Sequence, residues 1–231
     1  ADPVVRKSAQ RFFKEGISCY GVKTAAVYRI AGLHWKRVKD LPKKSIYGLC
    51  GELFASGIQE EAGVVCDWVP RLADSFERGD LRIFKKWIGN HVDNWAKCDM
   101  FCNHTLGDFI DRFPDSASEI RSWSGSKNRW MKRAAAVAFI LPCRRGNYLK
   151  EALETADALL EDPDDMVQKG YGWLLKEASR LHRSEVLDFV MKRRDRMPRT
   201  ALRYAIELMP PGMRKKAMQK DAAPARPKRR V

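Results

Sequence analysis

The sequence predicts an all-α protein built as a solenoid of stacked helical pairs. Apolar residues recur with a period near 3.6 along almost the whole chain, and no run alternates apolar and polar residues between hairpin turns. Trp95, Arg133 and Trp173 are separated by 38 and 40 residues, close to the repeat of about 40 to 47 residues in some proteins made of helical pairs. Equivalent positions of such repeats stack along one wall, so we expect these three side chains on a common concave face.

In the first half of the chain, glycine and proline residues divide the periodic segments. The predicted helices cover residues 5–14, 24–38, 45–56, 59–77, 81–90 and a segment running to 113. A loop lies between Gly16 and Gly21, Pro42 interrupts the chain after the second helix, and Pro114 ends the last. Asp80 precedes the 81–90 helix, whose free backbone N–H groups favour an acidic neighbour.

The second half continues the same pattern. The predicted helices cover residues 116–123, 128–141, 147–160, 164–181, 184–191 and 198–209. We expect Pro142 to end the second of these, the acidic residues around Asp164 to cap the fourth, and Pro198 to fit the first turn of the last. About a dozen helices in consecutive hairpins favour a solenoid over a single bundle.

Composition and charge point to an anionic partner. The formal net charge is +15, of which +7 falls in residues 214–231, so the rest of the chain carries +8. We assign residues 1–209 to the helical domain. Pro210, Pro211 and Gly212 open a basic tail over 210–231 that we expect to be disordered, especially from 222 on.

Targeting and redox signals indicate a soluble protein of the cell interior. No stretch approaches a membrane span, and the first residues lack the apolar core of a signal peptide. The six cysteines are scattered without close pairs, which is typical of a reduced protein. We therefore expect a cytoplasmic, nucleoid-associated location in a bacterium, or a nuclear one in a eukaryote.

A candidate site emerges from four residues. Trp95 and Asp99 are four residues apart in a run that reads as helix, so the ring and the carboxylate share one face. Arg133 lies in an apolar helix where an inward-facing charge needs a partner, and Asp99 supplies one if the two helices adjoin. A purely structural reading of Trp95, Asp99 and Trp173 stays open, because tryptophans are often core residues, as we expect for Trp87, Trp123 and Trp130.

These residue types suit a reaction of a cationic nucleobase. A base alkylated at a ring nitrogen is positively charged and leaves without a general acid. The sugar then develops oxocarbenium character, which a carboxylate such as Asp99 stabilises while orienting water. Tryptophan faces such as those of Trp95 and Trp173 attract cations. A bidentate arginine fork on Arg133 can grip a phosphate or hold Asp99.

Several blocks of the sequence resemble the AlkD-type DNA alkylation repair family. The resemblance spans about residues 6–209 and is carried by 13–15, 20–23, 95–99 (WAKCD), 128–135 (NRWMKRAA), 168–173 (QKGYGW) and 199–207 (RTALRYAIE). It implies a HEAT-like solenoid that cradles double-stranded DNA. It also implies a monofunctional glycosylase that removes N3- and N7-alkylated purines without inserting the base into a tight pocket. On this resemblance the catalytic residues are Asp99, Trp95, Trp173 and Arg133.

The expected partner is double-stranded DNA containing alkylated bases, bound by a monomer. The basic residues expected near the wall are Arg129, Lys132, Lys169, Lys176 and Arg203. Each of them is at least as compatible with a solvated helix face as with a phosphate contact. Together they predict an affinity that falls steeply with salt.

Other chemistry finds little support in the sequence. Cys98, Cys102 and His104 lack a second cysteine pair at zinc spacing, and glycine-rich phosphate loops are missing, so we expect no metal and no cofactor. Two alternatives to the glycosylase remain. One is a catalytically silent module that binds distorted or branched DNA, and the other is a protein-binding scaffold. The intact quartet favours the enzyme, and the basic charge argues against the scaffold.

Overall fold

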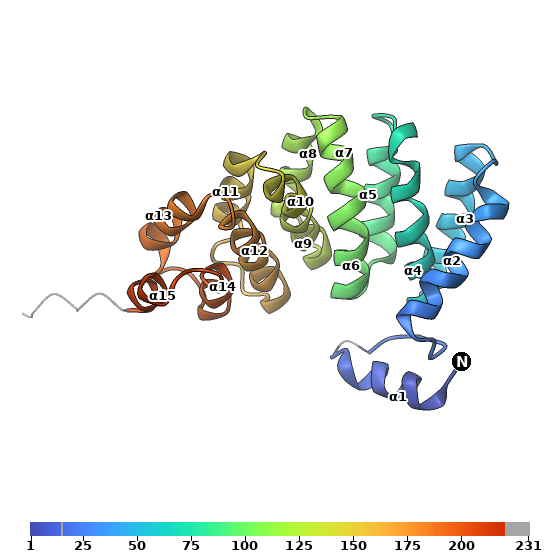
Figure 1. The fold of residues 1–231 in the computed structure, drawn as a ribbon, viewed down its shortest axis with the longest axis horizontal. Coiled ribbons are helices and arrows are strands. Elements are labelled where there is room, and N and C mark those ends of the chain that lie inside the picture. Colours follow the sequence, from blue (N-terminus) through green and yellow to red (C-terminus); the bar gives the residue numbers. More distant parts are fainter. Residues whose placement is uncertain (15, 220–231) are drawn as a thin grey trace, which may run out of the picture.

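The structure, a computed structural model, describes residues 1–14 and 16–219. It is an all-helical solenoid, as the sequence predicts. Its helices follow one another along an arc, and α1 lies apart on the open side of that arc (Figure 1). The elements of the first half are α1 (Pro3–Phe12), α2 (Thr24–Val38), α3 (Lys43–Ala55), α4 (Gln59–Trp68), α5 (Asp80–His91), α6 (Trp95–Phe101) and α7 (Gly107–Arg112). Those of the second half are α8 (Ser116–Ser122), α9 (Arg129–Val137), α10 (Ile140–Arg144), α11 (Leu149–Ala158), α12 (Asp165–Ala178), α13 (Arg183–Arg193), α14 (Arg199–Ala205) and α15 (Pro211–Met218).

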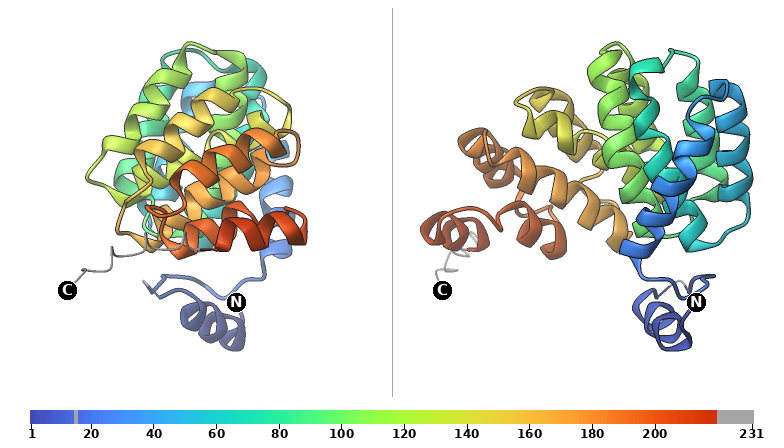
Figure 2. Two further views of the ribbon diagram at one scale, coloured as in Figure 1. Left: turned by 90° about the vertical axis from the view of Figure 1, so that its left-hand side faces the viewer. Right: turned by 45° about the vertical axis from the view of Figure 1, so that its right-hand side comes forward.

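Two rows of helices run along the arc. In the first row, α2, α4, α6, α9, α12 and α14 each contact the next. The second row consists of α3, α5, α8, α11 and α13, which pack against the first and link its repeats. The right-hand view of Figure 2 shows the helices stacked in this way, with α1 separate from the body. Within the described residues, no helix is both long and apolar enough to span a bilayer.

A continuous hydrophobic core fills the space between the two rows. Trp87, Trp123 and Trp130 are buried in it, which confirms the prediction for these three rings. Burial of such large rings stabilises the stack of repeats more than any other residue type. Because the core is continuous, each repeat supports the position of the next.

Three predicted helices are interrupted. The helix expected to run to 113 consists of α6, a π-helical segment at Cys102–Leu106 and α7. The helix expected over 59–77 ends at Trp68, and a 3₁₀ helix at Pro70–Ser75 follows, because Pro70 has no N–H with which to continue an α-helix. The helix expected over 128–141 ends at Val137. Pro142 does not end it but lies in the first turn of α10. Backbone N–H groups of a first turn have no acceptor within the helix, so a proline there removes no hydrogen bond.

The C-terminal boundary also differs from the sequence prediction. Pro210, Pro211 and Gly212 do not open an irregular tail, because Pro211 is the first residue of helix α15. Proline is favoured at that position, since its fixed φ suits a helix start. Ala217 of α15 is buried, so the helix docks on the solenoid. The disorder expected from residue 222 lies outside the described residues.

Several hydrogen bonds fix the segment between α1 and α2 to α4, and one carboxylate accepts three of them. Glu60 accepts hydrogen bonds from the backbone N–H groups of Tyr20, Gly21 and Val22, at 2.8 to 3.0 Å. Gly21 has a φ of +87°, and a Cβ there would lie 2.4 Å from the carbonyl oxygen of Asp2. This turn therefore requires glycine and brings the start of α1 back onto the segment.

Candidate active site

The first turn of α6 is held by the two residues that precede it and by the segment at the start of α4. Asn94 caps the helix by accepting a hydrogen bond from the Lys97 N–H, and its amide donates to Gln59. Lys97 is buried, and its ammonium donates to the Gly57 carbonyl and to Asp93, both at 2.9 Å. These contacts fix the helix that presents Trp95 and Asp99.

Arg133 of α9 and Asp99 of α6 form the bidentate pair that the sequence predicts. Nε and Nη2 of Arg133 each donate to a separate oxygen of Asp99, both at 2.7 Å. Nη1 donates to the Met166 carbonyl. The arginine fork is thus committed to the carboxylate and to a backbone carbonyl, so the phosphate grip considered for Arg133 has no support in this geometry.

A glycine of α12 makes room for this arginine. A Cβ at Gly170 would lie 3.1 Å from Cγ of Arg133, so the stem of the arginine passes directly over the helix backbone. The side chains of Arg133 and Asp99 are only 6% and 16% exposed. The residual exposure of Asp99 leaves lone pairs for a group beside it, because each carboxylate oxygen accepts more than one hydrogen bond.

Burial and pairing have opposite effects on the pKa of each member of the pair. It raises the pKa of the Asp99 carboxyl above its usual value, although the hydrogen bonds and charge of Arg133 pull in the opposite direction. Burial alone would lower the pKa of Arg133, but Asp99 raises it. A carboxylate in such surroundings interacts strongly with a nearby cation, since little water screens the two charges.

The pair opens into a cleft of about 570 Å³. The structure brings the whole predicted quartet together there, since Trp95, Asp99, Arg133 and Trp173 all line it. A second cleft of about 560 Å³ begins on the other side of Asp99 and shares Trp173 with the first. Asp99 and Trp173 therefore line both clefts.

Both tryptophans of the quartet are partly buried, but in different ways. Trp173 faces both clefts, whereas Trp95 is covered on one side by the end of the α1 segment. Phe13 stacks on Trp95 with ring centroids 5.4 Å apart, and Phe12 meets its edge at 5.8 Å. The first helix, although separate from the solenoid body, thereby forms one wall of the site.

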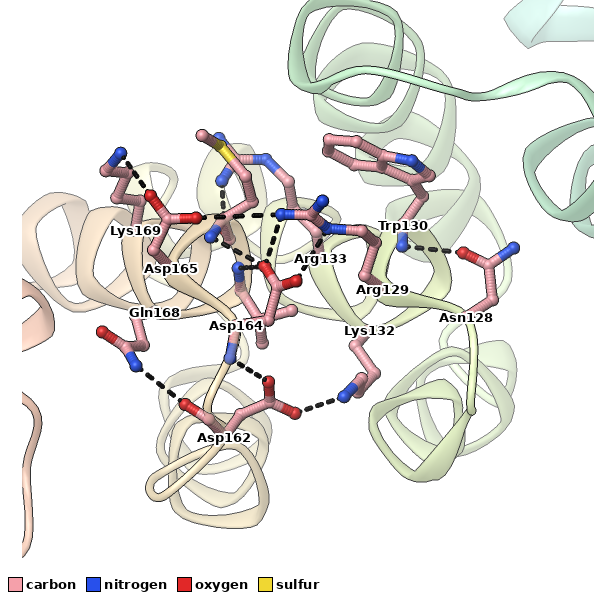
Figure 3. A network of polar contacts seen from close by, with 12 residues as sticks. Asn128, Arg129, Trp130, Lys132, Arg133, Asp162, Asp164, Asp165, Gln168 and Lys169 are labelled. Carbon is pink, nitrogen blue, oxygen red and sulfur yellow. Dashed lines mark hydrogen bonds and ion pairs between the residues drawn. The ribbon is translucent and has the colours of Figure 1, made fainter. Parts of the chain in front are cut away.

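The predicted DNA-binding residues differ in what they contact. Arg129 pairs with Asp164, the cap of α12, at 2.8 Å, and Lys132 pairs with Asp162 (Figure 3). Both contacts tie α9 to the turn before α12, so each of these cations has a carboxylate partner within the fold. The Asp164 cap itself, which accepts from two N–H groups of α12, confirms the predicted helix start.

The other three basic residues differ in whether they line the cleft. Lys169 pairs with Asp165 at 3.0 Å, and Lys176 pairs with Glu207 at 2.7 Å. Both lysines line the cleft. Arg203 is exposed and does not line it. The two cleft lysines are thus the members of the predicted set that are best placed to meet a ligand beside Asp99.

Four further residues line the cleft that the sequence reasoning did not assign to it: Phe12, Lys14, Met166 and Tyr204. Phe12 precedes one of the blocks that carry the family resemblance, and Tyr204 lies inside another. Those blocks were therefore the sequence feature that could have pointed to these two residues. Their contacts with the site cross the fold and have no periodicity along the chain. Spacing alone could not have identified them.

The thiols and imidazoles of the chain form no evident metal centre. Cys98 and Cys102 are fully buried in the core behind Asp99, whereas His104 is exposed. Among the described residues, no group of three His, Cys, Asp or Glu side chains is arranged to hold a metal ion. Burial raises the pKa of the Cys102 thiol well above its usual value, which disfavours the thiolate that metals bind.

Comparison with known proteins relates this arrangement to DNA repair. The family model described as "DNA alkylation repair enzyme" matches residues 1–209. A solved structure of a predicted DNA alkylation repair enzyme from Enterococcus faecalis superposes with a TM-score of 0.81. It shares 15% sequence identity, and the match covers 90% of this chain and 96% of that one, which establishes a common fold. No curated protein matches the sequence.

Proposed function

The chain belongs to the DNA alkylation repair enzyme family, and on that premise we propose that it is a DNA glycosylase for cationic N3- and N7-alkylated purines. The observation that carries the proposal is the buried Asp99–Arg133 pair, which opens into a cleft between Trp95 and Trp173. A buried ion pair costs desolvation energy. One that still faces a cleft is typical of a site where charge develops.

In the proposed reaction, the glycosidic bond between the sugar C1′ and N9 of the purine alkylated at N3 or N7 breaks. Its electron pair stays with the base, which leaves as a neutral molecule. Asp99 stabilises the positive charge that forms on the sugar and orients a water molecule for attack at C1′. The water loses a proton to solvent, and an abasic site remains. Because the base carries its own positive charge at the start, no general acid is required.

The other three residues of the quartet orient Asp99 and contact the sugar. Arg133 holds the Asp99 carboxylate in one orientation through its fork. The faces of Trp95 and Trp173 contact the sugar as it becomes cationic. Recognition through sugar and charge is compatible with a base that is not inserted into a tight pocket. The proposal includes action by a monomer on double-stranded DNA, in the compartment that holds the chromosome.

A single-turnover assay tests the proposal. A duplex carrying one 7-methylguanine is incubated with excess protein, and abasic sites are then cleaved with alkali. We expect base release by the wild type and a loss of roughly 10²- to 10³-fold or more in Asp99→Asn, because the carboxylate acts in the transition state. DNA binding by the variant should stay within a few-fold of the wild type.

The matched control is Asp188→Asn, which changes an exposed aspartate on α13. It should behave as the wild type. Circular dichroism of both variants separates lost chemistry from lost folding, since Asp99→Asn leaves the buried Arg133 beside a neutral partner. If the wild type releases no base while salt-sensitive DNA binding persists, the chain is instead a catalytically silent DNA-binding module.

A further inference from the structure

Tyr204 of α14 lies in the cleft beside Arg133 and Trp173 without an assigned role. The side chain is half-buried. Within the described residues its hydroxyl takes part in no hydrogen bond. A phenol at the wall of a charged cleft generally has a partner when it is buried. The free hydroxyl of Tyr204 is therefore available to whatever occupies the cleft.

Close packing of two helices fixes this tyrosine. A Cβ at Gly172 of α12 would lie 2.7 Å from Cβ of Tyr204 and 3.0 Å from the Ala201 carbonyl oxygen. Helix α14 thus rests directly on the backbone of α12, one residue before Trp173. Arg133 and Tyr204 line the same cleft.

Lys176 lies next to Tyr204 on the same side of the cleft. It follows Trp173 by three residues on α12 and so shares its face. Its ammonium contacts Glu207, whose backbone N–H donates to the Tyr204 carbonyl at 3.1 Å. The Glu207 side chain is 52% exposed, so its hold on Lys176 is weak in water. A doubly coordinating anion can displace it.

The chemistry of these two groups suits a phosphodiester. An ammonium has donors only, and a phenol can donate its O–H, whereas the non-bridging oxygens of a phosphodiester only accept. Arg133, which also lines the cleft, is already committed to Asp99 and to the Met166 carbonyl. The backbone of a bound nucleotide therefore meets Tyr204 and Lys176 before it meets a free guanidinium.

We propose that Tyr204 and Lys176 form a phosphate-binding subsite that holds the phosphodiester next to the lesion. Held there, the lesion's sugar lies between Trp173 and Asp99. The identity of the lesion rests on the function proposed above, but the subsite itself requires only a DNA backbone in the cleft. It takes over the phosphate contact that Arg133 cannot make in this geometry.

A double-mutant cycle between protein and DNA tests the subsite without any catalysis. The ligand is a fluorescein-labelled duplex with one tetrahydrofuran abasic analogue. One of the two flanking phosphates is replaced in turn by a neutral methylphosphonate. Fluorescence anisotropy gives the Kd of the wild type and of Tyr204→Phe for each duplex. Phe keeps the Cβ and ring that pack on Gly172, so the variant retains the helix contact.

We expect wild-type affinity to fall about tenfold for methylphosphonate at one of the two positions, the size of a hydrogen bond to a charged group. Tyr204→Phe should bind the duplex with unmodified phosphates more weakly by a similar factor. Its Kd should not rise further when the methylphosphonate is at that position. The subsite would be overturned if the effects of Tyr204→Phe and of the methylphosphonate on Kd multiply at both positions. It would also be overturned if Tyr204→Phe binds DNA as tightly as the wild type. The control Tyr148→Phe removes a hydroxyl that donates to Ile110 outside the cleft and should leave Kd unchanged.

The outcome separates this subsite from the glycosylase itself. Coupling in the cycle without base release from 7-methylguanine DNA would support the subsite and contradict the enzyme. Base release by the wild type with independent losses in the cycle would support the enzyme and contradict the subsite. Lys176→Met run through the same cycle should show coupling at the same phosphate as Tyr204→Phe.

Discussion

At the scale of single residues, the Asp99–Arg133 pair decides what the site can do. Removing one partner of such a buried pair costs about 3 to 5 kcal/mol, whereas the intact pair adds little net stability. Stability alone therefore gives no reason for a charged pair in this core. Its value lies in presenting an oriented carboxylate in surroundings where little water competes for it.

The raised pKa of Asp99 predicts an acid limit for catalysis. The carboxylate must be ionised to stabilise a cation, and burial raises its pKa above the ordinary value of 3.8. The single-turnover rate should therefore fall as pH drops through a value above 3.8, and level off at neutral pH. A pH series of base release from a 7-methylguanine duplex measures this apparent pKa directly.

Acid unfolding should follow only at lower pH. Asp115, Asp157 and Asp165 have pKa values lowered by Arg or Lys partners. Their contributions to stability are present above the unfolded value of 3.8 and are lost as pH falls through the lower folded values. Protonation of Asp99 is easier in the folded chain, so it does not promote unfolding. A rate that falls together with the helical signal would contradict this separation.

At the scale of elements, helix α12 organises the site through two glycines. Gly170 admits the stem of Arg133, and Gly172 admits Tyr204 and the backbone of α14. The block 168–173 is thus more than a carrier of Trp173. Its glycines set the distance of the two neighbouring helices from α12, and through them the width of the cleft.

Gly172→Ala should destabilise the protein by about 1 to 3 kcal/mol, since the added methyl meets backbone atoms that cannot yield. It should also weaken DNA binding by moving Tyr204. Chemical denaturation and anisotropy measure the two effects. Gly89→Ala is the matched control, because nothing lies within 4 Å of a Cβ at that exposed helical position. That variant should be unchanged or slightly more stable. Equal effects of the two substitutions would refute the packing argument.

Sequence reasoning located most helices because their apolar period is local information. It failed where a proline takes one of two roles that sequence alone does not separate. Pro70 ends an α-helix, whereas Pro142 and Pro211 lie in the first turns of new helices. Which role applies depends on how the next segment packs.

The site was also partly predictable from a regular spacing along the chain. Trp95, Arg133 and Trp173 repeat at the period of the solenoid, so stacking brings them together. The cover that Phe12 and Phe13 place on Trp95 could not be predicted, because α1 lies outside the repeat and its contacts span more than 80 residues. A count of charges likewise could not predict that Arg129 and Lys132 pair with acidic residues of a turn.

At the scale of the whole molecule, much of the positive charge is neutralised within the fold. Arg145, Arg193 and Arg196, for example, each pair with carboxylates on other elements. The 44 lysines and arginines therefore outnumber the cations free to meet DNA, whereas the net charge of +15 already allows for these pairs. The lysines that line the cleft, Lys14, Lys169 and Lys176, are the ones placed to act beside Asp99.

This distribution predicts the salt dependence of DNA binding. Each phosphate neutralised on B-DNA contributes about −0.9 to the slope of log K against log salt, so three cleft lysines give about −2.7, and cations elsewhere make it steeper. Anisotropy titrations of a tetrahydrofuran duplex between roughly 50 and 200 mM salt measure the slope. Lys176→Met should flatten it by about 0.9. Lys192→Met, which removes an exposed lysine of α13 away from the cleft, should leave it unchanged. If both variants flatten the slope equally, DNA contacts the protein through diffuse charge, and the cleft has no special part in binding the backbone.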